Sequence, residues 1–295
     1  PHHVAKMSGI GCSSKSPNYF LNKAHGFNSV HGRMPSVTTG ANMANRDLIY
    51  LGMSGDGDSA SIGLGQFSHV VRRQLNMLYM VANNGVYGLT KGQLAATADK
   101  GVTNKAGEHS LFTDIDLCTM ALQLGATFVA RSFSGDKKQL VPLIKAAISH
   151  QGFAFIDIIS PCVTFNNHKG STRSYDYVHE HITTAAVADF VPVKKEITSD
   201  CASGSYEDIC LHDGSLMRIK KLQDDYQTTD TMQAIIDIEK HKKKGEILTG
   251  LFYLDPTATH YHEINNTCDI PLNQLTQDSL CPGSRVLSGI NNSFR

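Results

Sequence analysis

Two groups of residues with side-chain oxygens stand where apolar runs end. The run 48–53 is followed by GDGD at 55–58, and the run 77–82 is followed by NNG at 83–85. A carboxylate, an amide oxygen and a backbone carbonyl suit Mg²⁺, which commonly takes phosphate oxygens as further ligands. Glycines beside Asp56 let the backbone approach an anion, and a following helix would point its N-terminus at it. The residues alone therefore predict a site for Mg²⁺ and a diphosphate.

A parallel sheet would bring these two groups together. Strands are predicted over 47–54, 77–82, 127–131 and 153–159, with helices between them over 60–75, 115–124 and 140–150. We place Pro142 in the first turn of the last helix, where proline is tolerated. Such alternation across 47–162 is typical of an α/β fold with a doubly wound, mostly parallel sheet. Ligands bind such sheets at the carboxyl ends of the strands, where Asp56 and Asn84 would meet.

The second half of the chain has a weaker pattern. A helix is predicted over 231–244 and a strand over 246–254, but residues 255–295 have little periodicity. We therefore divide the chain into an α/β domain for cofactor binding over 1–165 and an irregular C-terminal extension over 166–295. The extension is expected to contact a partner.

Composition excludes several classes of function. The 295 residues carry 27 basic and 27 acidic side chains, so the charge predicts neither nucleic acid nor an acidic membrane surface as a partner. No apolar run approaches the length of about 20 residues that a membrane helix needs. The seven cysteines are scattered, contain no CxxC pair and accompany no export signal, which favours reduced thiols or metal ligation over a disulfide framework. We expect a cytoplasmic location.

A GDG followed by NN, with 27 positions from Asp56 to Asn83, resembles the signature of enzymes that use thiamine diphosphate (TPP). GDG alone would equally fit two glycine turns in an ordinary Rossmann-like sheet. The chain also holds five further motifs: GIGCSSK at 9–15, HGR at 31–33, NNGVYGLTKGQ at 83–93, ATFVARSFSGD at 126–136 and SPCVTFN at 160–166. Together they resemble the β subunit of 2-oxoacid:ferredoxin oxidoreductases, most closely the 2-oxoglutarate type.

The resemblance covers residues 4–167 tightly and implies roles for single residues. Mg²⁺ would be held by the side chains of Asp56 and Asn84 and the carbonyl of Val86. The residues implied in TPP binding are Ile10, Gly11, Cys12, Ser13, His31, Gly57, Asp58, Gly88 and Leu89. Lys15 and Lys91 would lie near the 2-oxoacid carboxylate or coenzyme A.

The resemblance also implies a [4Fe-4S] cluster with Cys12 and Cys162 as two of its ligands. The family's other two cysteines form a CxxC upstream of the GIGC run, and we expect that an N-terminal segment carrying it is missing from this sequence. If the protein truly lacks that motif, the cluster is in doubt.

The chain supplies one α/β sheet, whereas TPP needs two half-sites. We therefore expect an α subunit to supply the pyrimidine half-site and an activating glutamate in an α2β2 assembly, with ferredoxin as electron acceptor. The implied reaction is oxidative decarboxylation of a 2-oxoacid to its acyl-CoA, reversible as reductive carboxylation. The alternatives are a non-redox TPP-dependent decarboxylase or synthase subunit, which would not need Cys12 and Cys162, and a non-catalytic scaffold subunit.

Overall fold

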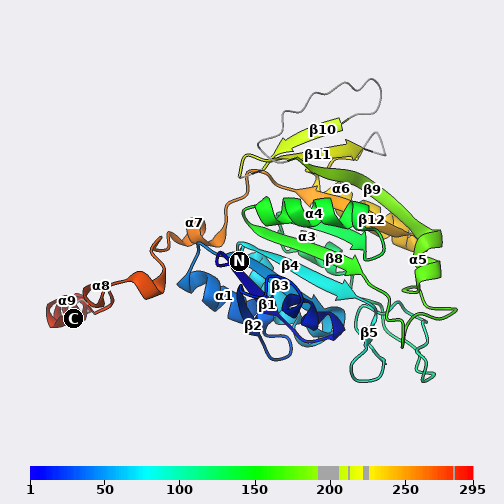
Figure 1. Cartoon of the computed structure of the whole chain (residues 1–295), viewed down its shortest axis with the longest axis horizontal. Coiled ribbons are helices and arrows are strands. Elements are labelled where there is room, and N and C mark those ends of the chain that lie inside the picture. Colours follow the sequence, from blue (N-terminus) through cyan, green and yellow to red (C-terminus); the bar gives the residue numbers. More distant parts are fainter. Residues whose placement is uncertain (192–205, 212, 222–225, 282, 295) are drawn as a thin grey trace.

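The computed structural model describes residues 1–191, 206–211, 213–221, 226–281 and 283–294. Within these residues one large sheet runs through the molecule in the order β10-β11-β9-β12-β7-β8-β4-β3-β1-β2 (Figure 1). Its strands are β1 (Val4–Ser8), β2 (His25–Asn28), β3 (Ile49–Gly55), β4 (Met77–Asn83), β7 (Phe128–Phe133), β8 (Phe153–Ile159), β9 (Ile182–Val191), β10 (Tyr206–Cys210), β11 (Leu216–Lys221) and β12 (Ile247–Leu254). A separate small hairpin is formed by β5 (Val86–Tyr87) and β6 (Gln93–Leu94).

The half of the sheet from β7 to β2 is entirely parallel, as the alternation of strands and helices predicted. In this half β3 and β4 are direct neighbours, with Gly55 opposite Ala82. The loops after both strands therefore leave the sheet at the same edge. Beyond β7 the sheet becomes mixed, because β12 runs antiparallel to β7 and parallel to β9.

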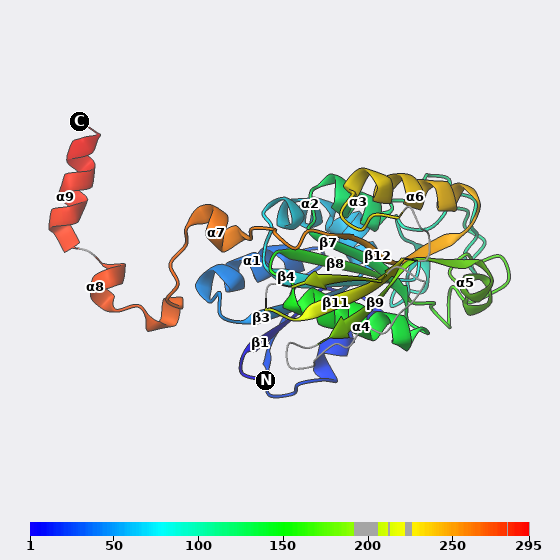
Figure 2. The same ribbon diagram turned by 90° about the horizontal axis from the view of Figure 1, so that it is seen from above.

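Helices cover both faces of the sheet, which confirms the doubly wound fold (Figure 2). One face buries apolar side chains of α1 (Met34–Ala44), α2 (Leu64–Arg72), α3 (Leu117–Gln123) and α6 (Thr231–Lys243). The other face is covered by α4 (Lys137–Ser149), which buries Leu143 and two alanines against the strands. An aromatic group at the centre of the first face joins α2 to β8, where the Phe67 and Phe155 rings meet edge to face at 5.2 Å.

Two predicted helices differ from the structure. The helix expected over 60–75 is split into a π-helix, η2 (Gly57–Ile62), and α2. The split lies at Gly63, whose Cα is so close to Gly32 that a Cβ added to Gly63 would lie 2.8 Å from the Gly32 Cα. The placement of Pro142 in a first turn was wrong: the Asp136 side chain caps α4 earlier, accepting a hydrogen bond from the Gln139 N–H.

The chain after residue 165 is more regular than its sequence pattern indicated. It forms α5 (Tyr175–His181), strands β9 to β12 and α6, and these strands extend the same sheet. The helix predicted over 231–244 and the strand predicted over 246–254 are present as α6 and β12. The division into two domains at residue 165 stays a prediction.

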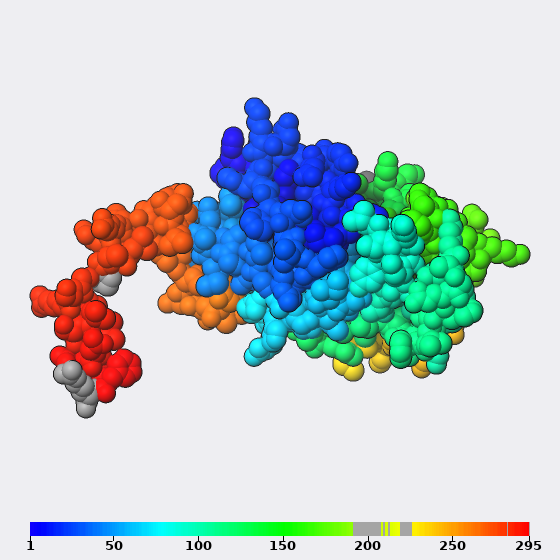
Figure 3. All heavy atoms as spheres, turned by 90° about the horizontal axis from the view of Figure 1, so that it is seen from below, coloured from blue at the N-terminus to red at the C-terminus, as the bar shows by residue number. Residues whose placement is uncertain are grey.

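Only helical elements occur in the described part of the chain after β12: α7 (Tyr261–Asn265), η3 (Leu272–Gln274), α8 (Gln277–Leu280) and α9 (Gly283–Ser293). The last of them stands clear of the body in Figures 1 to 3, and none of its residues is buried. Among the helices that the structure describes, none combines the length and apolar character needed to cross a membrane.

Candidate functional site

The predicted cofactor and Mg²⁺ residues gather around one cavity at the carboxyl ends of β1, β3 and β4. Asp56 follows β3 directly, and Asn84 follows β4 directly. The cavity is lined by Ile10, Gly11, Cys12, Ser13, His31, Gly55, Asp56, Gly57, Asp58, Ala82, Asn84, Val86, Tyr87, Gly88, Leu89 and Thr90. Every residue predicted to touch TPP or to hold Mg²⁺ is in this set, although the roles themselves stay predictions.

Asp56 is the most deeply buried of the residues predicted to hold Mg²⁺, with 1% of its surface exposed. Its Oδ2 accepts hydrogen bonds from the Gly85 N–H at 3.0 Å and from the Thr97 hydroxyl at 2.5 Å. Burial raises the pKa of Asp56 to about 6, because the charged carboxylate loses its water. A bound divalent cation would supply the positive charge that such a carboxylate needs, so the residue fits a metal ligand.

Asn84 is held in place by its own turn. Its side-chain Oδ1 accepts a hydrogen bond from the Val86 N–H at 3.1 Å, and its backbone carbonyl accepts one from the Asn166 amide at 2.7 Å. The turn thus places an amide oxygen and the Val86 segment beside Asp56. Carboxylate, amide and carbonyl oxygens together make a hard donor set of the kind that Mg²⁺ prefers.

Two glycines let neighbouring side chains pack closely in the cavity wall. A Cβ added to Gly57 would lie 2.5 Å from the ring of Tyr87, whose hydroxyl donates a hydrogen bond to the Gly57 carbonyl at 3.0 Å. A Cβ added to Gly88 would lie 2.9 Å from the Cys12 sulfur. The space beside each glycine is thus filled by a side chain of the protein, so these two glycines let the cavity wall pack closely. The π-helix that begins at Gly57 is a rare element that often marks functional sites.

Asp58 connects three segments of the wall. Its Oδ1 lies 2.6 Å from His31 Nδ1 and accepts a hydrogen bond from the Gly32 N–H at 2.8 Å. Its Oδ2 accepts from the Ser54 hydroxyl at 2.6 Å and from the Ile10 N–H at 3.2 Å. The carboxylate is thus engaged by protein groups, so we expect Asp58 to act on a cofactor through the positions of His31 and Ile10.

Cys12 and Cys162 lie close together in space although strands β2 to β8 separate them in the sequence. A Cβ built on Gly88 would lie 2.9 Å from the Cys12 sulfur and 3.5 Å from the Cys162 sulfur. Burial and the neighbouring Cys162 raise the pKa of the Cys12 thiol. Among the described residues no group of three or more His, Cys, Asp or Glu could hold a metal. A [4Fe-4S] cluster usually has four thiolate ligands, so two more would have to come from outside the described residues.

The two predicted lysines lie apart from the Mg²⁺ ligands. Lys15 lines an adjoining groove that it shares with Cys12 and Leu89. Lys91 is exposed in the turn between β5 and β6, outside the lining of the cavity. Its φ of 82° is unusual for a residue with a side chain, a form of strain that clusters at functional sites.

The residue-by-residue prediction omitted Tyr87, Thr97 and Asn166, which all contact its members. Tyr87 packs on Gly57, Thr97 donates to Asp56, and Asn166 donates to Asn84. Tyr87 and Asn166 lie inside the motifs at 83–93 and 160–166, so the motifs could have indicated that these two residues belong to the site. Thr97 lies in a polar loop and offered no such signal.

Comparison with known proteins identifies the family of the chain. Residues 8–158 match the family model described as "Thiamine pyrophosphate enzyme, C-terminal TPP binding domain". The chain is 42% identical over 168 residues to a 2-oxoacid:ferredoxin oxidoreductase subunit beta of Saccharolobus solfataricus, covering 57% of this chain and 55% of that protein. It is 39% identical over 166 residues to the 2-oxoglutarate oxidoreductase subunit KorB of Mycobacterium tuberculosis, covering 56% of this chain and 44% of that protein.

A solved structure resembles nearly the whole chain. The 2-oxoglutarate:ferredoxin oxidoreductase from Magnetococcus marinus, solved with 2-oxoglutarate, coenzyme A and succinyl-CoA bound, superposes with a TM-score of 0.70 at 27% identity, covering 97% of this chain and 82% of that one. The chain spans about half the length of the curated relatives cited above. The predicted resemblance is confirmed. Because the family model spans more than half of the sequence, the chain belongs to the thiamine pyrophosphate enzymes as a carrier of their C-terminal TPP-binding domain.

Proposed function

We propose that the chain is the TPP-binding β subunit of a 2-oxoacid:ferredoxin oxidoreductase that acts on 2-oxoglutarate. It would convert the 2-oxoacid and coenzyme A to acyl-CoA and CO₂, passing electrons to ferredoxin, and could run in reverse as reductive carboxylation. The observation that carries this proposal is the convergence of the predicted TPP and Mg²⁺ residues on one cavity. The similarity to oxidoreductase β subunits supports the choice of reaction.

In this proposal Asp56 and Asn84 hold Mg²⁺ through their side chains and Val86 through its carbonyl. Bound TPP supplies a carbon nucleophile and an electron sink for the decarboxylation of a 2-oxoacid. Gly57 and Gly88 allow Tyr87 and Cys12 to pack closely at the wall of the proposed diphosphate site, because neither glycine has a side chain. His31 is oriented by Asp58 at 2.6 Å, which fixes one of its ring nitrogens at the wall of the cavity.

The pair Cys12 and Cys162 favours the redox reaction over a non-redox TPP enzyme. Two thiols beside the cavity would supply half of the ligands of a [4Fe-4S] cluster, and the remaining two would come from the expected CxxC. Lys15 and Lys91 are proposed to attract the carboxylate of the 2-oxoacid or the phosphates of coenzyme A. Attraction of this kind needs only a positive charge near the path of the substrate.

The second half of the cofactor site is proposed to come from an α subunit. The sheet provides one set of strand ends for the diphosphate, and the described residues contain no second sheet of comparable size. The α subunit would bring the pyrimidine half-site and the activating glutamate in a cytoplasmic α2β2 complex.

Turnover of the complex tests the proposed function. The complex is purified without oxygen and assayed with coenzyme A, a viologen acceptor and a panel of 2-oxoacids. We expect acyl-CoA and reduced viologen with 2-oxoglutarate as the preferred substrate. We expect no turnover from Asp56→Ala and normal turnover from Asp47→Ala, an exposed carboxylate just before β3, at the end of the strand opposite Asp56. A colourless complex that decarboxylates without reducing viologen would favour the non-redox alternative. Unchanged activity in Asp56→Ala would favour a scaffold role.

A further inference from the structure

A loop beyond the matched family domain holds both sides of the candidate Mg²⁺ site. This loop, residues 166–173, follows β8 and Cys162 and begins after residue 158, where the family model ends. It does not line the cavity. One of its contacts reaches the turn that carries Asn84, and another reaches Thr97, which binds Asp56.

The first contact fixes the Asn84 turn. Asn166, 2% exposed, donates a hydrogen bond from its side-chain amide to the Asn84 carbonyl at 2.7 Å. The backbone N–H of Asn166 donates in turn to the Cys162 carbonyl at 2.8 Å. The Asn84 peptide is therefore tied to the same short segment that carries Cys162. A buried amide of this kind is costly to leave unpaired, so the bond resists displacement of the turn.

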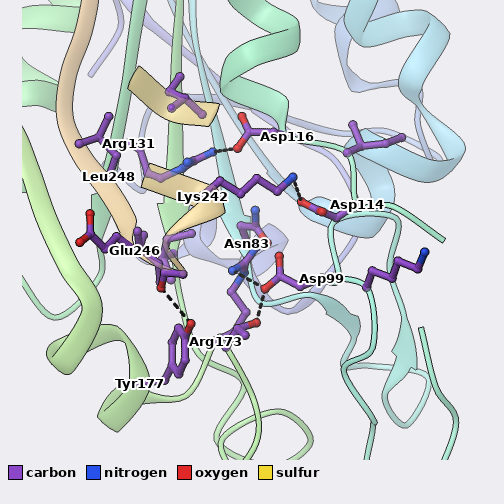
Figure 4. Close-up of a pocket in the computed structure, with 17 residues that line it drawn as sticks. Asn83, Asp99, Asp114, Asp116, Arg131, Arg173, Tyr177, Lys242, Glu246 and Leu248 are labelled. Carbon is purple, nitrogen blue, oxygen red and sulfur yellow. Dashed lines mark hydrogen bonds and ion pairs between the residues drawn. The ribbon is translucent and has the colours of Figure 1, made fainter. Parts of the chain in front are cut away.

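The second contact reaches Asp56 through Thr97. Arg173 donates to the Thr97 carbonyl at 3.2 Å, and the Thr97 hydroxyl donates to Asp56 Oδ2. Arg173 is itself oriented by Asp99 at 3.3 Å, and Figure 4 shows the two side chains facing each other at the wall of a neighbouring cavity. Because Thr97 is 1% exposed, water does not compete with the Asp56 carboxylate for the hydrogen bond from the Thr97 hydroxyl.

The loop is locked between these two contacts by Ser171. Its hydroxyl donates to the Asn166 carbonyl at 3.1 Å and accepts from the Arg173 N–H at 3.1 Å. The residue is buried, so water does not compete for these bonds. Ser171 therefore joins Asn166 to Arg173.

We propose that the 166–173 loop positions the Mg²⁺ ligands, with Asn166 setting Asn84 and Arg173 setting Asp56 through Thr97. The inference rests on the proposed function, because it needs the metal to lie between Asp56 and Asn84. Asn166, Arg173 and Thr97 are positioning residues, since they act through other side chains. Partners that orient metal ligands typically change metal affinity by 10- to 100-fold when removed.

Metal binding by the intact complex tests the loop. The complex is stripped of metal and TPP, TPP is added back, and Mn²⁺ is titrated while free Mn²⁺ is followed by electron paramagnetic resonance. Thr97→Val removes the hydroxyl with little change in shape, and Thr97→Ser keeps it. We expect Thr97→Val to weaken Mn²⁺ binding by about 10- to 100-fold and Thr97→Ser to bind nearly as the wild type does.

A second pair of variants tests the loop itself. Asn166→Ala is compared with the control Asn167→Ala. The wild-type Asn167 side chain is exposed and accepts a hydrogen bond from the Tyr175 N–H, away from Asn84. We expect weaker Mn²⁺ binding in the first variant alone, with melting temperatures of the metal-free complexes that stay close to the wild type.

Three results would overturn the inference. The first is wild-type Mn²⁺ affinity in Asn166→Ala, whatever Thr97→Val does, because Thr97 lies outside the loop. The second is equal loss of affinity in Thr97→Val and Thr97→Ser, since the hydroxyl would then not matter. The third is a wild-type complex that binds TPP with no divalent cation, which would also remove the proposed function. The first two results concern the variants alone, so the wild-type complex would still bind TPP with a divalent cation and the proposed function would stand.

Discussion

Gly57→Ala should weaken TPP binding although it adds a single methyl group. The new Cβ would lie 2.5, 2.7 and 2.9 Å from three carbons of the Tyr87 ring, whereas carbon atoms in contact lie about 3.5–4.0 Å apart. The ring would have to withdraw by about 1 Å, and it belongs to the same strand as Val86, whose carbonyl is a proposed Mg²⁺ ligand.

The size of the effect follows from two costs. Overpacking of this kind costs about 1–3 kcal/mol. Displacing the ring also endangers the hydrogen bond from the Tyr87 hydroxyl to the Gly57 carbonyl, worth about 0.5–1.5 kcal/mol. If most of this cost falls on the geometry that binds the cofactor, TPP affinity falls by about 10- to 100-fold, because each 1.4 kcal/mol is a factor of about ten.

The assay is a calorimetric titration of TPP into the metal-loaded complex. The double variant Gly57→Ala/Tyr87→Leu removes the ring that meets the methyl group, so part of the lost affinity should return. Tyr87→Phe removes only the hydroxyl and should cost about tenfold or less. Wild-type affinity in Gly57→Ala, or a double variant no better than the single one, would refute this reasoning.

Three further predictions concern stability and assembly. Arg131 pairs with Asp116 at 2.7 Å and with Asp157 at 2.8 Å (Figure 4 shows the first pair). Arg131→Met should therefore leave the buried Asp157 and the partly buried Asp116 carboxylates without their cation and lower the free energy of unfolding by about 3–5 kcal/mol, measured by denaturant titration. Burial lowers the pKa of His262 from 6.5 to about 4, so the stability that its neutral ring contributes is complete above pH 6.5 and is lost as the pH falls towards 4. His262→Ala should therefore make the melting temperature less sensitive to acid, and a pH profile of the melting temperature like that of the wild type would contradict this. Deleting the chain from Gly283 onward should leave the melting temperature of the β chain within about 1 °C, because α9 buries no residue, while gel filtration should show weaker assembly if this end contacts a partner.

The sequence was enough to predict which residues gather at this cavity, because its signals are local. Asp56 and Asn84 each follow a strand directly, so a parallel sheet is enough to bring them to one edge. The parallel strands themselves are apolar runs buried on both faces, as β4 and β8 show, and such runs are easy to recognise.

The sequence pattern did not indicate strands that are exposed at the edge of the sheet or that pair in its antiparallel part. Every residue of β2 is exposed at the edge of the sheet, so no apolar pattern indicates it. The strands β9 to β11 pair mainly through the antiparallel part of the sheet, which depends on contacts between distant segments. The split between η2 and α2 depends on close packing of Gly63 against Gly32, which no helical periodicity records.

The polar contacts around Asp56 were beyond a reading of the sequence. Thr97 lies 41 positions from Asp56, and Asn166 lies 82 positions from Asn84. Such bonds have no spacing rule, because they depend on how loops fold over the completed sheet. Asp58 was predicted as a cofactor residue, and the structure adds that its carboxylate already joins three segments of the protein.

Binding of TPP as a function of Mg²⁺ concentration tests the central claim most directly. The wild-type complex, Asp56→Ala and the control Asp47→Ala are stripped of metal and cofactor and titrated with TPP by calorimetry, with and without Mg²⁺. We predict that the wild type and Asp47→Ala bind TPP only when Mg²⁺ is present, and that Asp56→Ala does not bind it under either condition. Equal, Mg²⁺-dependent binding by all three proteins would contradict the assignment of Asp56 as a metal ligand.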